Sequence, residues 1–320
     1  MRSMLDILLI TLPFFALVLC GYVATRREFL PQVAIPGLNT FVLYFALPCM
    51  LFRFGATTPI ANSLSAGIVG VYLFCAVIMV SFTVAVTLSQ RVDWNDAAFG
   101  ALVAAFPNTG YMGVPLLVAL LGTAAAGPAI VTILVDLLFT SSLCIALSRL
   151  GGADSHGAAV AARNVVKGVL SNPMPWSIVL GVAVFVTGVT LPAPVMQTIG
   201  LLADSASPVA LFTIGAVLAR SQMVTTDPTP LIDYVPVALK KLVLHPLLVL
   251  IMGHSAISLG VPLDPFALTV IVLVAALPSA SNVAMLAERF DADSGRIARI
   301  ILVSTALAFV TFSGAVALLA

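Results

Sequence analysis

Two polar segments interrupt apolar stretches of the chain and contain the residues best suited to bind a small charged ligand. The first is FPNTGYMGVP (106–115), with Pro107, Asn108 and Thr109; the second is LPSASN (277–282), with Pro278, Ser279, Ser281 and Asn282. Proline removes a backbone donor and clashes with the preceding turn, so each segment is expected to break a helix. The hydroxyl and amide side chains add neutral hydrogen-bonding groups at both breaks.

A helix broken in this way begins again as a half-helix, whose first N–H groups lack intrahelical acceptors and carry partial positive charge. Two such ends that meet would attract an anion such as a carboxylate. In hydrocarbon, free backbone groups are tolerated only inside protein or beside a water-filled cavity, and paired interruptions point to a substrate site near the midplane. The alternative is that the prolines only kink two helices. The pairing and the polar side chains favour the binding site.

Three further residues are candidates for coupling or gating. Asp136 lies in the middle of an apolar stretch, where an aspartate costs roughly 2.5–3.5 kcal/mol on insertion scales, so it should face the interior. It is either a proton or cation coupling site or a structural partner of a polar neighbour. Lys241 either orders the helices or neutralises an anion, unless it snorkels toward the interface like Lys240. Glu288 ends an apolar stretch and is either a gating residue or interfacial.

Two more polar residues could contribute to a substrate site. Asn39 lies within an apolar stretch, and Asp204 lies near the start of another, beside two serines. Asp204 could line the site or cap the helix, and Asn39 faces the same choice between a binding and a structural role.

Composition decides the class of protein. Hydrophobic residues make up 61% of the 320 residues, charged residues 8%, and the mean hydropathy is +1.16. A soluble domain carries about 25% charged residues, so lipid must cover most of this surface. The net charge of +1 gives no indication of the basic surface that nucleic-acid binding needs. The sequence contains no phosphate-loop motif, no nucleophile-elbow motif and no cluster of metal ligands. We therefore expect a protein that is not an enzyme and that binds no cofactor or metal.

The apolar stretches predict an all-α integral membrane protein with ten spans, because a span needs about 20 apolar residues. The expected spans are 5–24, 34–54, 64–89, 97–121, 126–149, 172–190, 197–219, 235–259, 266–288 and 296–319. With ten spans, the loops on the side of the termini carry Arg2 and Arg53, whereas those on the opposite side carry ten Lys and Arg residues. Positive loops stay in the cytoplasm, so both termini are expected on the outer face.

An internal repeat relates the two halves of the chain. FALPCMLFRFGA (45–56) aligns with SASPVALFTIGA (205–216), which matches Pro48 with Pro208 and Gly55 with Gly215, and AAFPN aligns with AALPS at the two breaks. Five spans in each half would make the second half enter the membrane in the opposite sense, as in many transporters. We therefore expect inverted repeats at 1–150 and 172–320, joined by a cytoplasmic loop at 151–171.

Three strings give a family resemblance. PNTGYMGVPLL from Pro107 resembles the helix-4 crossover of the auxin efflux carrier family, within the bile acid/arsenite/riboflavin transporter superfamily. LNTFVLYFALPCMLF from Leu38 resembles helix 2, and LPSASNVAMLAERF from Leu277 resembles the bacterial form of the helix-9 crossover. The family includes plant auxin exporters and bacterial carriers of dicarboxylates such as malate and malonate.

The resemblance implies a scaffold of helices 1, 2, 6 and 7 that also forms a dimer contact. Helices 3–5 and 8–10 would form a transport domain that moves by an elevator mechanism, with broken helices 4 and 9 crossing at the substrate. Pro107 and Pro278 match the crossover prolines, and Asn108 matches the asparagine beside the first. Asp204 and Lys241 match an Asn or Asp in helix 7 and a basic residue in helix 8. The acid and lysine of helix 3 in the plant carriers have no counterpart here.

The expected protein is therefore a homodimeric secondary transporter of the bacterial inner membrane for a small organic anion, with malonate or malate as the expected substrate. The coupling ion, proton or sodium, stays open. The alternatives are a sodium-coupled carrier of another organic anion on the bile-acid-transporter fold and an exporter of auxin-like indole acids.

Overall fold

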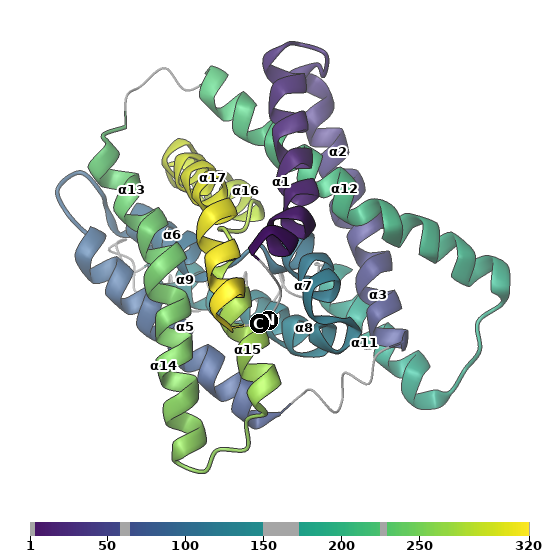
Figure 1. Ribbon diagram of the computed structural model, residues 1–320. Helices are drawn as coiled ribbons and strands as arrows, with labels where there is room; N and C mark the ends of the chain where they lie inside the picture. The colour runs from purple at the N-terminus through teal and green to yellow at the C-terminus, as the bar shows by residue number, and fades with distance from the viewer. Residues whose placement is uncertain (1–3, 58–64, 150–172, 225–228, 320) are drawn as a thin grey trace.

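The computed structural model describes residues 4–57, 65–149, 173–224 and 229–319, and every regular element within these ranges is helical (Figure 1). The expected loop at 151–171 lies outside the described residues. Many large apolar side chains of the described helices are exposed, including Leu9, Phe82 and Leu180. Such a surface suits lipid and not water.

Within the described residues, seven helices are long and apolar enough to cross a membrane, judged by length and composition. Three of them are segmented by a π-helical turn. The seven are α1 (Met4–Arg26); α2 (Ile35–Phe41) with α3 (Leu47–Thr57); α5 (Ala66–Thr87); α8 (Ala126–Val135) with α9 (Ser141–Ser148); α12 (Ala193–Val224); α13 (Leu231–Leu239) with α14 (His245–Ser258); and α17 (Ser294–Leu319).

Three apolar helices in the described part of the chain are shorter. They are the segment Thr109–Leu121, which contains α7 (Val114–Leu121); α11 (Pro173–Thr187); and α15 (Pro265–Ala276). Two of them adjoin another short helix in the same apolar stretch, since α6 (Trp94–Ala105) precedes α7 and α16 (Asn282–Arg289) follows α15.

Proline explains where these two stretches break. A residue that precedes proline is driven out of the helical region toward extended backbone. Phe106 and Leu277 both precede prolines, and their ψ angles are 103° and 156°. Helix α6 consequently ends at Ala105, and α15 ends at Ala276.

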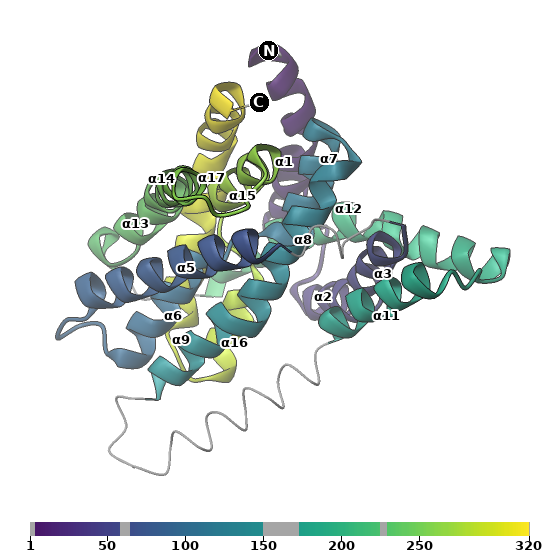
Figure 2. The same ribbon diagram turned by 90° about the horizontal axis from the view of Figure 1, so that it is seen from below.

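The helices gather into two groups (Figure 2). One contains α2, α3, α11 and α12, and the other contains α5, α6, α9, α13, α14 and α15. Helix α1 joins the first group through glycines, because a Cβ on Gly21 would overlap the carbonyl oxygen of Phe212 and a Cβ on Gly215 would overlap that of Val18. Helices α1 and α12 therefore touch backbone to backbone.

Helices α3 and α11 make the same kind of contact. A Cβ on Gly55 would lie 2.9 Å from the carbonyl oxygen of Ile178, and a Cβ on Gly181 would overlap that of Phe52. Such close approaches exclude any side chain, so the two helix pairs form tightly fitted units.

A buried arginine of α17 binds two helices of the second group at one end. The Arg296 Nε donates to the Asp233 carbonyl oxygen at 2.8 Å, and its Nη1 donates to the Asp96 carbonyl oxygen at 3.0 Å. The Asp293 carboxylate accepts from the Arg296 N–H at 2.8 Å. Gly100 makes room, because a Cβ there would lie 3.0 Å from Arg296 Nη1. Arg296 thereby joins α6, α13 and α17.

We expect Arg296→Met to lower the free energy of unfolding by about 2 kcal/mol, because two partly buried carbonyl acceptors lose a charged donor. The matched control is Arg91→Met. Arg91 is largely exposed and makes only a 3.7 Å ion pair with Asp233, so its loss should cost less than about 1 kcal/mol. Thermal melts in detergent measure both variants. Equal melting temperatures for the two would contradict the assignment.

Candidate substrate site

The two proline breaks meet and pair through their backbones. The Asn108 N–H donates to the Pro278 carbonyl oxygen at 2.8 Å, and the Ala280 N–H donates to the Phe106 carbonyl oxygen at 2.9 Å. The pairing is antiparallel, as between two strands. Backbone groups freed by the prolines thus satisfy each other where no water would reach them. We call this short double segment, residues 106–108 with 278–280, the crossing.

A new half-helix begins immediately after each side of the crossing. The Asn108 carbonyl accepts from Met112 and Gly113 N–H groups at 3.1 and 3.0 Å and opens the turn at Thr109–Gly113. On the other side, α16 begins after Ser281, and neither Asn108 nor Ser281 caps its helix with its side chain. The first N–H groups therefore have no side-chain cap from these two residues. The Thr109 N–H donates instead to the Pro107 carbonyl oxygen at 2.8 Å, and the Val283 N–H donates to the Ala280 carbonyl oxygen at 3.4 Å.

Four buried polar atoms at the crossing have no hydrogen-bond partner in the described part of the chain. They are Asn108 Oδ1, Thr109 Oγ1, Tyr111 Oη and Ser279 Oγ. A buried polar atom without a partner costs about 1–3 kcal/mol. Buried groups of this kind call for a specific explanation, and a bound polar ligand would supply it.

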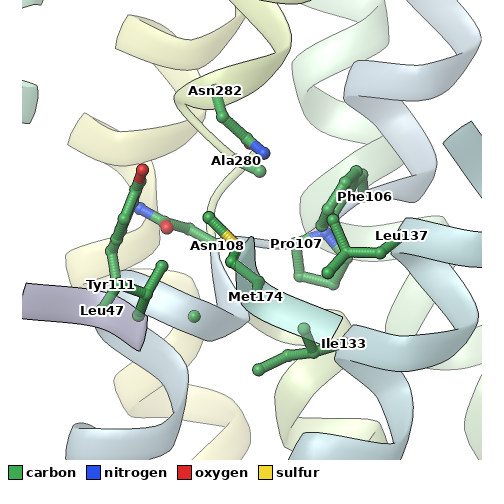
Figure 3. Close-up of a pocket in the computed structure, with 11 residues that line it drawn as sticks. Leu47, Phe106, Pro107, Asn108, Tyr111, Ile133, Leu137, Met174, Ala280 and Asn282 are labelled. Atoms are coloured by element: carbon green, nitrogen blue, oxygen red, sulfur yellow. The ribbon is translucent and has the colours of Figure 1, made fainter. Parts of the chain in front are cut away.

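A pocket with about 310 Å³ of space between its atoms, part of it open at the mouth, lies beside the crossing (Figure 3). Helices α3 and α11 contribute Leu47 and Met174, and the segment around α8 contributes two apolar side chains. Its lining is Leu47, Phe106, Pro107, Asn108, Gly110, Tyr111, Ile133, Leu137, Met174, Ala280 and Asn282.

The lining is mostly apolar with a few polar groups, which is the usual make-up of a small-molecule site. Figure 3 shows the amides of Asn108 and Asn282 and the phenol of Tyr111 among apolar side chains. None of the described lining residues is charged. A preference for anions would therefore arise from the two half-helix N-termini and from the amide donors.

The seven residues proposed from the two interrupting segments all lie in or beside the crossing. Pro107, Asn108 and Asn282 line the pocket. Thr109 and Ser281 are their neighbours in the chain, whereas Ser279 pairs with Pro107 and Pro278 accepts from the Asn108 N–H across the crossing. The Ser279 N–H donates to Ser304 Oγ at 3.2 Å, which anchors the crossing to α17.

Three other predicted residues are not in the lining. Asn39 lies on α2 and is half-buried, and Glu288 is exposed in the last turn of α16. Asp204 on α12 accepts a 2.7 Å hydrogen bond from Arg53 Nη1 on α3. Asp204 is therefore part of an ion pair between α3 and α12.

Asp136 is fully buried and is not among the lining residues, although its chain neighbour Leu137 is. Its Oδ2 accepts from the Tyr72 hydroxyl at 3.1 Å, and its Oδ1 accepts from the Thr140 hydroxyl at 3.0 Å. Asp136 opens one of the π-helical turns, a feature that is frequent at functional sites. The carboxylate thus has polar partners on α5 and on its own helix.

Lys241 is also fully buried and lies in the π-helical turn Lys240–Leu244. Its Nζ donates to the Ala275 carbonyl oxygen at 2.7 Å and lies 3.0 Å from His245 Nδ1. The lysine does not snorkel, since its charge is held inside the protein beside the end of α15.

Sequence reasoning missed several residues of these sites. Tyr111 was visible within the interrupting segment, but Leu47 and Met174 reach the pocket from distant helices and give no local signal. Tyr72 donates to Asp136, and Ser304 accepts from the Ser279 N–H, in both cases between segments far apart in the sequence. No motif around Tyr72 or Ser304 in the sequence indicates these contacts.

Comparison with known proteins gives the family. A family model described as "Membrane transport protein" matches residues 7–156 and again 157–316. A Rhizobium meliloti protein named "Putative malonate transporter" is 30% identical over 97% of this chain and 95% of its own length. The Escherichia coli K12 "Uncharacterized transporter YfdV" is 27% identical over 88% and 87%, and an "Uncharacterized transporter" of Methanothermobacter thermautotrophicus is 25% identical over 94% of each. The chain therefore belongs to the membrane transport protein family, that of the auxin efflux carriers, and is a multi-pass membrane transporter and not an enzyme.

Proposed function

We propose that this protein is a secondary carrier of a small organic anion, a mono- or dicarboxylate such as malonate or malate, which binds at the crossing. The observation that carries this is the set of three unpartnered buried hydroxyls, on Thr109, Tyr111 and Ser279, which can donate to a carboxylate where two half-helices begin beside a pocket. Backbone N–H groups at helix starts are preorganised donors for a carboxylate. The name of the Rhizobium meliloti relative supports malonate as the first compound to try.

An auxin-like indole acid is the second candidate. The rings of Phe106 and Tyr111 both line the pocket and could contact an aromatic ligand. Asn108 and Asn282 favour a small polar acid over an indole acid. Their amide N–H groups can donate to a second carboxylate, whereas an indole ring offers no such acceptor.

We further propose ten spans in two inverted five-helix repeats. The glycine contacts support this, because Gly21 and Gly181 lie 160 positions apart (181 − 21), and so do Gly55 and Gly215 (215 − 55). Gly21 touches the helix of Gly215, and Gly181 touches the helix of Gly55. The same close packing thus occurs twice, each time between a helix of the first half and a helix of the second half.

An elevator mechanism follows from this division. Helices α1, α2, α3, α11 and α12 would be the scaffold, and the remaining helices would move with the crossing. The pocket supports this, since Leu47 and Met174 come from the scaffold while Asn108 and Asn282 come from the moving group. The asymmetry of Lys and Arg supports a bacterial inner-membrane protein with both termini outside. The homodimer rests on the family resemblance alone.

Thermal-shift measurements on the purified protein test the anion site. A ligand at 100 times its dissociation constant should stabilise the folded state by about 2.7 kcal/mol. We expect a shift with malonate or malate and none with the uncharged dimethyl ester of malonate. A shift with indole acids alone would select the second candidate. A folded sample that responds to no organic anion would refute the proposal.

A further inference from the structure

A second polar site lies apart from the pocket lining. It consists of Tyr72, Asp136, Thr140, Lys241 and His245, which we call the buried charge cluster. Asp136, Lys241 and His245 have no solvent exposure, and Tyr72 has none either. The Tyr72 and His245 rings lie 6.0 Å apart between centroids, which places the two halves of the cluster in contact. The cluster brings together α5, the turn before α9 and the turn before α14.

Lys241 binds the carbonyl end of a broken helix. Its acceptor, Ala275, lies in the last turn of α15, two residues before Leu277, whose extended backbone starts the crossing. The last carbonyls of a helix have no intrahelical donor and carry partial negative charge. An ammonium at 2.7 Å satisfies one of them and offsets that charge.

An ionised Lys241 needs a compensating negative charge inside the protein. Neither ion pair within 4 Å found among the described residues involves Lys241, so no carboxylate contacts it directly. Asp136 is the carboxylate of the same cluster, held by Tyr72 and Thr140. With both groups ionised the cluster is neutral, whereas loss of either one would leave an uncompensated buried charge.

In secondary transporters with broken helices, the carbonyl ends of half-helices are where coupling cations are coordinated. We propose that Lys241 is a built-in cation at the carbonyl end of α15, in the place of a dissociable sodium ion, so that anion binding at the crossing needs no sodium. This inference rests on the proposed function and selects against its sodium-coupled alternative. Lys241 is a positioning residue, because it acts through Ala275 on the segment that carries Pro278 and Ser279.

The first experiment measures malonate binding to the wild-type protein by calorimetry in sodium buffer and in matched choline buffer. We expect dissociation constants that agree within about twofold, since a two-fold change is only about 0.4 kcal/mol. Affinity that requires sodium overturns the inference and leaves the anion site intact. Absence of binding to any organic anion in either buffer instead refutes the proposed function, so the two failures are distinguishable.

The second experiment compares Lys241→Ala with Lys240→Ala. Lys240 is the adjacent lysine, only half-buried, with its ammonium over the Phe82 ring, so it controls for charge and position. Lys241→Ala should weaken malonate binding roughly tenfold or more, because the hydrogen bond to the Ala275 carbonyl at the end of α15, just before the crossing, is lost. Added methylammonium or sodium should restore the malonate affinity of Lys241→Ala. The Lys240→Ala variant should bind malonate with the wild-type affinity.

Two outcomes would overturn the assignment. Unchanged affinity in Lys241→Ala would show that the crossing does not depend on the ammonium. Lost affinity that no small cation restores would assign Lys241 to packing alone.

A charge-balanced variant guards against misfolding. Asp136→Asn/Lys241→Met removes both charges, so it should elute as a folded species even if Lys241→Ala does not. Its malonate affinity should still fall roughly tenfold, because Ala275 has lost its donor. Wild-type affinity in this folded double variant would refute the role of Lys241.

Discussion

Replacing Asn108 with alanine should weaken malonate binding roughly 10- to 150-fold while the protein still folds. The Asn108 side chain is 3% exposed, lines the pocket and leaves its Oδ1 without a protein partner. Its amide nitrogen would donate to a bound carboxylate, and a hydrogen bond to a charged group is worth about 1.5–3 kcal/mol. The backbone bonds of the crossing survive, since the Asn108 N–H and carbonyl remain. Calorimetric titration with malonate measures the effect.

The control is Asn95→Ala. Asn95 lies in the same interrupted stretch, but its Nδ2 donates to the Phe290 carbonyl oxygen at 2.9 Å, away from the pocket lining. This variant should lose some stability and keep its malonate affinity. If Asn108→Ala bound malonate as tightly as the Asn95→Ala control, the substrate would have to bind elsewhere.

Gly21→Val should prevent stable folding. A Cβ on Gly21 would overlap the carbonyl oxygen of Phe212, a backbone atom that no rotamer change can move, so α1 and α12 would have to separate. Overpacking of even adaptable cores costs 1–3 kcal/mol, and we expect a loss of more than about 3 kcal/mol here. Yield of monodisperse protein and thermal melts report the effect.

Gly200 provides a matched comparison on α12. A Cβ at this position meets nothing within 4 Å, so Gly200→Ala should be tolerated and gain helix propensity of about 1 kcal/mol. A Gly21→Val protein that melts like Gly200→Ala would mean that the α1–α12 contact is not close in the folded protein.

The sequence predicted the class of fold from composition and span length, because the bilayer fixes how many apolar residues a crossing needs. It also located the two breaks. Proline restricts its own backbone and that of the preceding residue to non-continuing conformations, whatever the rest of the fold is. Asn108 and Asn282 were visible as polar residues beside these prolines. The seven long helices among the described residues each overlap one range expected to span, with ends that differ by a few residues, whereas α11 and α15 are shorter than a span requires.

Contacts between segments far apart in the chain could not be predicted from the sequence. Asp204 pairs with Arg53, and neither residue carries a local mark of the other. Lys241 has a backbone carbonyl as its acceptor, and every residue has such a group, so no sequence pattern identifies Ala275. Met174 reaches the pocket only because α11 packs against α3 through glycines more than a hundred positions apart in the chain.

The crossing also has a consequence for how cargo preference can evolve. The two breaks are joined by main-chain hydrogen bonds from Asn108 to Pro278 and from Ala280 to Phe106, which require no particular side chain apart from the prolines. Mutations that alter the side chains at 108 or 282 therefore change the pocket lining without breaking the backbone hydrogen bonds of the crossing. Descendants of one ancestral carrier could diverge in the acids they move through a few substitutions, while the membrane architecture stays under separate selection.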